Sequence, residues 1–214
     1  MNNIIKKNIK KYLKYLKLDF IFYYLRARIY INKIAVTVEK ELINLPSIDD
    51  SLIQNQLELV SITSELLCEN SAIQKPIRYA DSERLKTAID YLGKGYCGVG
   101  LVGGNEILGD IWYTNACNSK HKKIHPDLKW LGMEGGDRDV YAFDMLVPAV
   151  HRGKNLATLL QMGALHMIKN NGYSRAFGYY WAENIPALWV HRLLKWNELK
   201  RLKVTRFLHM QFGR

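Results

Sequence analysis

The chain has 214 residues, of which 48% are hydrophobic and 24% are charged. This composition is typical of a globular protein and excludes an intrinsically disordered chain, a collagen-like repeat and a disulfide scaffold. Lysine and arginine number 31 against 20 acidic residues, and the excess lies at the two ends: residues 1–40 carry ten basic and two acidic side chains, and residues 151–214 carry eleven and two. Cationic ends favour anionic partners, such as nucleotide phosphates, an anionic membrane surface or nucleic acid.

The cysteines and the apolar runs indicate a cytoplasmic location. Cys68, Cys97 and Cys117 form no C-x-x-C pair and have no histidine at zinc-finger spacing, which predicts reduced thiols and no metal site. The run 18–25 is far shorter than the ~20 residues of a membrane span, and no signal peptide is visible. His121 and His125 lie in a basic, proline-containing setting that does not favour zinc.

The N-terminal segment predicts a basic amphipathic helix over residues 4–20, with isoleucine, leucine and aromatic residues on one face and lysines opposite. Such a helix either packs on the domain or lies at the anionic inner surface of a membrane, and both interpretations stay open. A strand is predicted over 29–38. The break at 45–55 separates a basic N-terminal extension, residues 1–50, from a main domain, residues 51–214.

The main domain alternates strands with helices, which predicts a mixed α/β sheet. A Gly-Gly-Asn sequence at 103–105 is suited to a tight hairpin turn, and residues 114–137 read as a long polar loop. The expected strands are 57–62, 96–102, 106–113, 139–147, 174–181 and 202–210, and the expected helices are 82–92, 156–170 and 184–196.

The junction 146–157 carries the most specific signal, because a strand there runs through a basic turn directly into a helix. The unpaired N–H groups and the positive dipole end of a helix start bind phosphate. Arg152 and Lys154 add charge, Gly153 permits close approach, and Asn155 tolerates left-handed geometry or caps the helix. The alternative is an ordinary turn with solvated basic side chains.

The loop Arg152-Gly153-Lys154-Asn155-Leu156-Ala157 resembles the cofactor loop Arg/Gln-x-x-Gly-x-Gly/Ala of the GNAT superfamily of acyl-CoA-dependent N-acetyltransferases. Asn155 stands where the family has glycine, and after Leu194 this chain has Lys195-Trp196 where the family usually has Gly-Phe. The resemblance covers roughly residues 56–210. It implies a GNAT-like α/β fold, with a mixed, mostly antiparallel sheet whose splayed central strands are flanked by helices, and it implies acetyl-CoA or another acyl-CoA as cofactor.

The resemblance also implies roles for individual residues. Asn184 matches the asparagine that helps hold the pantetheine arm, and His191 stands where many members have the tyrosine that protonates the leaving thiolate. The alternative for His191 is a helix histidine that faces solvent or packs beside Trp189. The general base for the amine is expected among Asp144, Glu134 and Glu183, of which Asp144 is favoured. The expected acyl-CoA contacts are Met145, Leu146, Val147, Arg152, Gly153, Lys154, Asn155, Leu156, Ala157 and Asn184.

The sequence therefore predicts a metal-independent N-acetyltransferase that transfers acetyl from acetyl-CoA to a primary amine of a small molecule or amino sugar by direct attack. Two alternatives remain open. One is an aminoacyl-tRNA-dependent transferase of GNAT-like fold, which is less favoured because such a protein does not need the phosphate-binding turn found here. The other is a non-catalytic module that binds a membrane or a partner.

Overall fold

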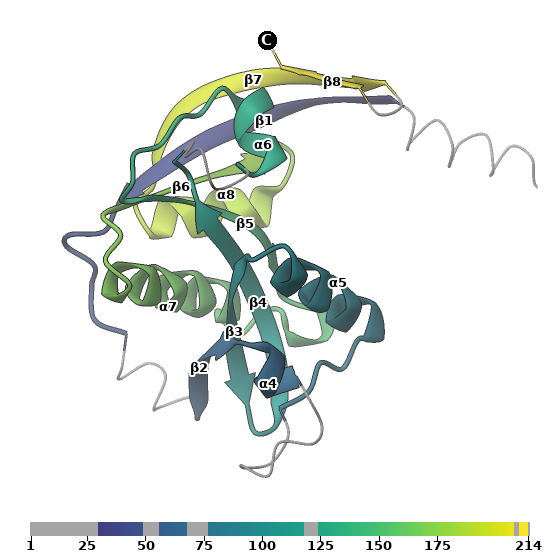
Figure 1. Ribbon diagram of the computed structural model, residues 1–214, viewed down its shortest axis with the longest axis vertical. Coiled ribbons are helices and arrows are strands. Elements are labelled where there is room, and N and C mark those ends of the chain that lie inside the picture. The colour runs from purple at the N-terminus through teal and green to yellow at the C-terminus, as the bar shows by residue number, and fades with distance from the viewer. Residues whose placement is uncertain (1–29, 49–55, 68–76, 118–123, 208–209, 214) are drawn as a thin grey trace, which may run out of the picture.

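The computed structural model describes residues 30–48, 56–67, 77–117, 124–207 and 210–213, and its centre is one eight-stranded sheet (Figure 1). The strand order is β2-β3-β4-β5-β6-β1-β7-β8. The strands are β1 (Tyr30–Glu41), β2 (Leu57–Ile62), β3 (Cys97–Gly103), β4 (Glu106–Asn115), β5 (Asp139–Leu146), β6 (Arg175–Trp181), β7 (Asn197–Phe207) and β8 (Met210–Gly213).

Helices cover both faces of the sheet, and each face has its own hydrophobic core. Figure 1 shows α7 and α5 on opposite sides of β3 and β4. The core on the α7 side includes Leu160 and Leu165, and the core on the α5 side includes Ala88 and Trp112. The helices are α4 (Ser64–Leu67), α5 (Ser82–Gly93), α6 (Pro126–Leu131), the 3-10 turn η1 (Ala149–His151), α7 (Leu156–Asn170) and α8 (Ile185–Leu193). None of the helices in this described part of the chain has the length and apolar character that a membrane crossing requires.

The two central strands, β5 and β6, form the only parallel pair among the described strands, and they separate early. Their pairing is limited to Asp139 with Arg175, Val140 with Ala176, and Tyr141 with Phe177. Both strands continue for four or more residues beyond this point. The expected mostly antiparallel sheet with splayed central strands is thus confirmed, and the splay opens a gap between two unpaired strand edges.

The segment 1–50, which the sequence separates as an extension, contributes a strand to the sheet itself. β1 pairs antiparallel with β6 on one side and with β7 on the other, so it lies inside the sheet. Ala35, Val36 and Val38 are buried, which explains the isoleucine- and valine-rich pattern that predicted a strand here. The helix predicted over residues 4–20 lies outside the described residues.

The structure corrects three element predictions. The expected loop 114–137 contains α6, which begins after His125, has Pro126 in its first turn and ends at Gly132 in the left-handed conformation. The helix predicted to reach Trp196 ends at Leu193, because Lys195 adopts a φ of 54° and the N–H groups of Lys195 and Trp196 donate back to the carbonyls of Arg192 and His191. The single final strand predicted over 202–210 is two antiparallel strands, β7 and β8.

Candidate active site

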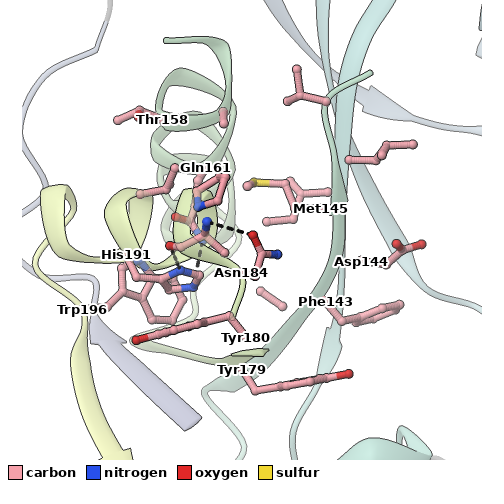
Figure 2. A pocket seen from close by; sticks show the side chains of 18 of the residues that line it. Phe143, Asp144, Met145, Thr158, Gln161, Tyr179, Tyr180, Asn184, His191 and Trp196 are labelled. Atoms are coloured by element: carbon pink, nitrogen blue, oxygen red, sulfur yellow. Dashed lines mark hydrogen bonds between the residues drawn. The ribbon is translucent and has the colours of Figure 1, made fainter. Parts of the chain in front are cut away.

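A pocket of about 870 Å³ occupies the gap between β5 and β6. Its walls come from both hydrophobic cores, so the cavity reaches both faces of the sheet. The lining residues are Tyr91, Ile111, His125, Asp127, Ala142, Phe143, Asp144, Met145, Leu146, Val147, Arg152, Gly153, Asn155, Leu156, Ala157, Thr158, Gln161, Tyr179, Tyr180, Trp181, Asn184, Pro186, Ala187, Val190, His191 and Trp196 (Figure 2).

A β-bulge shapes the β5 wall of this pocket. Trp112 of β4 opposes Phe143 and Asp110 opposes Leu146, so Ile111 alone faces both Asp144 and Met145. Asp144 has a φ of 46°, a left-handed conformation that is uncommon for a residue other than glycine. The bulge releases backbone groups at Asp144 and Met145 from the β4–β5 ladder, beside the pocket.

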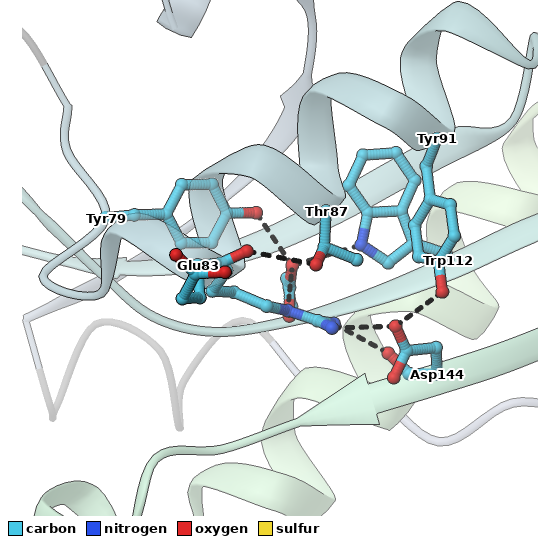
Figure 3. A network of polar contacts seen from close by, with 8 residues as sticks. Tyr79, Glu83, Thr87, Tyr91, Trp112 and Asp144 are labelled. Carbon is cyan, nitrogen blue, oxygen red and sulfur yellow. Dashed lines mark hydrogen bonds and ion pairs between the residues drawn. The ribbon is translucent and has the colours of Figure 1, made fainter.

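Arg84 of α5 holds the bulge through an extended polar network (Figure 3). Its guanidinium donates to the Asp144 carboxylate at 2.7 Å and to the Asp144 backbone carbonyl at 2.8 Å, and it forms an ion pair of 2.6 Å with Asp110. Asp110 is 1% exposed and also accepts from the Tyr79 hydroxyl and the Trp112 indole. Burial alone would lower the pKa of Arg84, but its bonds to the two carboxylates outweigh this and raise the pKa.

Asp144 therefore pairs with a basic neighbour, and the structure identifies this neighbour as Arg84. One of its carboxylate oxygens, Oδ2, accepts from both Arg84 and the Tyr91 hydroxyl. The side chain remains partly exposed at the pocket, so it can still attract a cation there. Its main structural contribution is to fix the bulge.

The turn before α7 has the geometry of an anion site. Gly153 has a φ of 87° and Asn155 a φ of 58°, so Asn155 keeps the left-handed conformation that glycine would adopt at this position. Its side chain makes no capping hydrogen bond. The N–H groups of Thr158 and Leu159 both donate to the Asn155 carbonyl, which leaves those of Leu156 and Ala157 at the helix start, where no preceding turn offers an acceptor.

The basic residues of this turn differ in position. Arg152 lines the pocket, and its Nε donates to the Val147 carbonyl at 3.1 Å. Lys154 is exposed and lies in the same turn, but it is not part of the pocket wall. Both add positive charge beside the unpaired N–H groups, which is the arrangement that binds a phosphate.

Asn184 and His191 line the α8 side of the pocket, where Asn184 caps the helix by accepting from the Ala187 N–H. His191 is 9% exposed, and its Nδ1 lies 2.7 Å from the Ala187 carbonyl, so Nδ1 carries the proton. Burial lowers the pKa of His191, which keeps the ring neutral with a lone pair on Nε2. This arrangement does not fit the expected proton donor to a thiolate, because the one ring proton is held by a helix carbonyl.

The burial of His191 and His125 should make the free energy of unfolding fall at acidic pH. Burial lowers the pKa of both His191 and His125, so the unfolded chain binds more protons than the folded protein once the pH falls below about 6.5. We expect the free energy of unfolding to be maintained above pH 6.5 and to fall with decreasing pH by up to about 1.4 kcal/mol per pH unit for each histidine. Urea denaturation between pH 5 and 8 measures this slope. The variant His191→Gln should show a shallower slope, and an equal slope in both proteins would contradict the assignment.

The α5 and α6 side of the pocket is aromatic and acidic. Phe143, Tyr179 and Trp181 line it together with His125 and Asp127. The Asp127 carboxylate accepts from the Trp130 indole at 2.9 Å and from the Tyr141 hydroxyl at 3.0 Å. The backbone N–H of Asp127 donates to Nδ1 of His125, so the neutral His125 ring carries its proton on Nε2.

Two expected bases lie away from the pocket. Glu134 is exposed and does not line it. Glu183 also lies outside the wall, where it forms an ion pair of 2.6 Å with Lys33, and this contact lowers the pKa of Glu183. Neither residue is therefore positioned to take a proton within the pocket, because Glu134 lies in the segment between α6 and β5, Glu183 lies in the turn after β6, and both side chains are exposed.

Several residues in or beside the pocket were missed by the sequence analysis, although some left a signal. Gln161 stands on the buried face of α7 beside Leu160, and Arg84 is buried on α5 with Ala88. A polar residue on an otherwise apolar helix face is such a signal. The pocket position of Trp196 left no signal, since tryptophan side chains are usually part of the hydrophobic core.

Comparisons with known proteins rest on structure alone: no family model matches the sequence, and neither does any curated protein. The chain is similar to a GCN5-related glucosamine N-acetyltransferase region of a fungal multi-domain GH3 β-N-acetylglucosaminidase, with 14% identity and a TM-score of 0.56 over 89% of this chain and 23% of that one. It is also similar to a tandem GNAT protein from the clavulanic acid biosynthesis pathway, with 13% identity and a TM-score of 0.50 over 79% of this chain and 51% of that one.

A Drosophila protein shows a comparable likeness, with 8% identity and a TM-score of 0.51 over 86% of this chain and 54% of that one. The chain thus spans about half the length, or less, of these three proteins. At such low identity the likeness concerns the fold. The chain therefore shares the GNAT-type fold of the glucosamine N-acetyltransferase region and of the tandem GNAT protein.

Proposed function

We propose that the protein is an acyl-CoA-dependent N-acyltransferase that transfers an acetyl group to a primary amine of a small molecule or amino sugar. The observation that carries this proposal is the continuity of one pocket, which joins the phosphate-binding turn before α7 to the bulge on β5. A diphosphate would lie at Gly153, Leu156 and Ala157, and the arm that follows would run between the unpaired edges of β5 and β6 toward Asp144.

The pocket residues fit the chemistry of acyl transfer. Backbone groups released by the bulge can donate to the thioester carbonyl and stabilise the negative charge that develops on its oxygen. An ammonium group first releases one proton to water, and the neutral amine attacks the carbonyl carbon. The carbon–nitrogen bond forms, the carbon–sulfur bond breaks, CoA leaves as a thiolate, and the second proton lost by the amine nitrogen converts that thiolate to the thiol of free CoA. Asp144 and Asp127 supply negative charge that attracts a protonated amine, and the aromatic side chains beside them suit the apolar face of a sugar or ring.

Calorimetric titration of acetyl-CoA into the protein tests the proposal. We expect saturable binding, and in the variant Arg152→Ala/Lys154→Ala we expect affinity to fall about 10- to 150-fold, because Arg152 lines the pocket and one hydrogen bond to a charged group contributes about 1.5–3 kcal/mol. The control is Lys129→Ala/Lys203→Ala, which removes the same charge at exposed positions outside the pocket. Absence of binding to the folded wild-type protein would refute the proposal and direct the search to tRNA and anionic liposomes.

A further inference from the structure

The α7 and α8 side of the pocket contains two buried polar atoms that have no hydrogen-bond partner within the described structure. They are Oε1 of Gln161 and Nε1 of Trp196, whose residues are 3% and 8% exposed. Both residues line the pocket, and both lie against His191: the Gln161 and His191 Nε2 atoms are 3.4 Å apart, and the rings of His191 and Trp196 are 5.1 Å apart (Figure 2). The two atoms therefore belong to one small cluster.

The hydrogen bonds of His191 determine which polar atoms of this cluster have no hydrogen-bond partner. Its Nδ1–H donates to the Ala187 carbonyl, so the Nε2 lone pair accepts from the amide NH2 of Gln161. This orientation of the amide leaves Oε1 as a free acceptor. The hydroxyl of the neighbouring Tyr180 donates to Glu198 at 2.7 Å, so its proton does not reach Oε1 of Gln161, and Nε1 of Trp196 makes no hydrogen bond to it.

The acceptor Oε1 of Gln161 and the donor Nε1 of Trp196 both have no partner. Together they define the chemistry of a ligand group that could form hydrogen bonds with both. Buried polar atoms in native proteins are nearly always hydrogen-bonded, so a partner is expected when the site is filled. A carboxylate would face the Gln161 carbonyl oxygen, and an ammonium would face the Trp196 N–H, so either charge leaves one contact repulsive. An uncharged group that both donates and accepts, such as a secondary amide or a hydroxyl, matches both atoms.

We propose that Gln161 and Trp196 bind an uncharged donor–acceptor group of the acyl-CoA and thereby select among acyl-CoA ligands. This inference rests on the proposed function. Acyl-CoA offers such a group in two places: the amides and the hydroxyl of its pantetheine arm, and a hydroxyl on the acyl chain when the chain carries one. The two sources share the same hydrogen-bonding chemistry and differ in which ligands contain them.

The test is calorimetry of the full chain with CoA, acetyl-CoA, butyryl-CoA and 3-hydroxybutyryl-CoA. The variants are Gln161→Met and Trp196→Phe, which remove the acceptor and the donor with little change in shape, and the control is Trp189→Phe, which makes the same change at a 56% exposed position of α8 outside the pocket. Each pocket variant should weaken binding about three- to tenfold, the size expected for one net hydrogen bond. The control should bind as the wild type does.

The set of ligands that lose affinity in the variants identifies which part of acyl-CoA the two side chains bind. An equal loss for all four ligands supports recognition of a pantetheine amide or hydroxyl, and a loss confined to 3-hydroxybutyryl-CoA supports recognition of an acyl hydroxyl. Wild-type affinity of both variants for every ligand would overturn the inference while leaving the proposed function intact. Failure of the wild-type protein to bind any of the four would overturn the proposed function and the inference with it. The ligand-induced rise in Tm should shrink in parallel, which a merely structural role would not produce.

Discussion

Replacing Arg84 with methionine is expected to lower the free energy of unfolding by about 3–5 kcal/mol, the range found when one partner of a buried ion pair is removed. Asp110 is 1% exposed, so the variant would leave its charge buried without a counter-ion. The bulge at Asp144 would also lose two of the hydrogen bonds that hold it, and affinity for acetyl-CoA should fall together with stability. Urea denaturation and calorimetry measure the two effects.

Two further variants separate the buried charge from a general effect on α5. Lys86→Met removes an exposed ion pair on the same helix and should leave the denaturation midpoint unchanged. The double variant Arg84→Met/Asp110→Asn removes the unpaired charge as well, so it should be more stable than Arg84→Met alone. Equal stability of the single and double variants would show that the buried charge of Asp110 is not the cause.

Substitution of Gly109 by valine should both destabilise the protein and weaken acyl-CoA binding. A Cβ atom at this position of β4 would lie 2.9 Å from the Leu146 carbonyl oxygen and 3.0 Å from a Val147 methyl group. Such overpacking typically costs about 1–3 kcal/mol. Because Leu146 and Val147 line the pocket, the displacement of β5 should also reduce affinity for acetyl-CoA by tenfold or more. Thermal denaturation and calorimetry provide the two measurements.

The matched control for this variant is Gly93→Ala. Gly93 is the last residue of α5, and a Cβ atom there would have no neighbour within 4 Å. This change should leave acetyl-CoA affinity unaltered and raise stability slightly, because alanine restricts the unfolded chain more than glycine does. If Gly109→Val bound acetyl-CoA as tightly as Gly93→Ala, the close approach of β4 to β5 would not shape the pocket.

The parts of the site that depend on neighbouring residues could be predicted from the sequence. The turn before α7 is local: a strand, a glycine, an asparagine and a helix start follow one another within residues 146–157, and the structure gives Gly153 and Asn155 the left-handed conformations that these residue types permit. The bounds of β2, α5 and α7 also agree with the prediction, because the hydrophobic periodicity of each element depends only on residues within that element.

The parts that depend on distant residues could not be predicted. Asp144 was favoured as a base, and only the fold brings Arg84, sixty positions earlier in the chain, to its carboxylate. Its rivals Glu134 and Glu183 are equally acidic in the sequence, but neither lines the pocket: Glu134 is exposed between α6 and β5, and Glu183 pairs with Lys33. The protonation state of His191 could not be predicted either, because it depends on the burial of the ring and on the hydrogen bond from Nδ1 to the Ala187 carbonyl.

The sequence by itself determined the periodic elements, the left-handed turn before α7 and the alternation that predicts a mixed sheet, because each is encoded by residues close together in the chain. The tertiary structure alone decided the insertion of β1 between β6 and β7, the burial of Arg84 with Asp110, and the meeting of Gln161, His191 and Trp196 in one wall. Local steric preference and hydrophobic pattern act within a segment, whereas strand pairing and desolvation act between segments that meet only when the whole sheet forms.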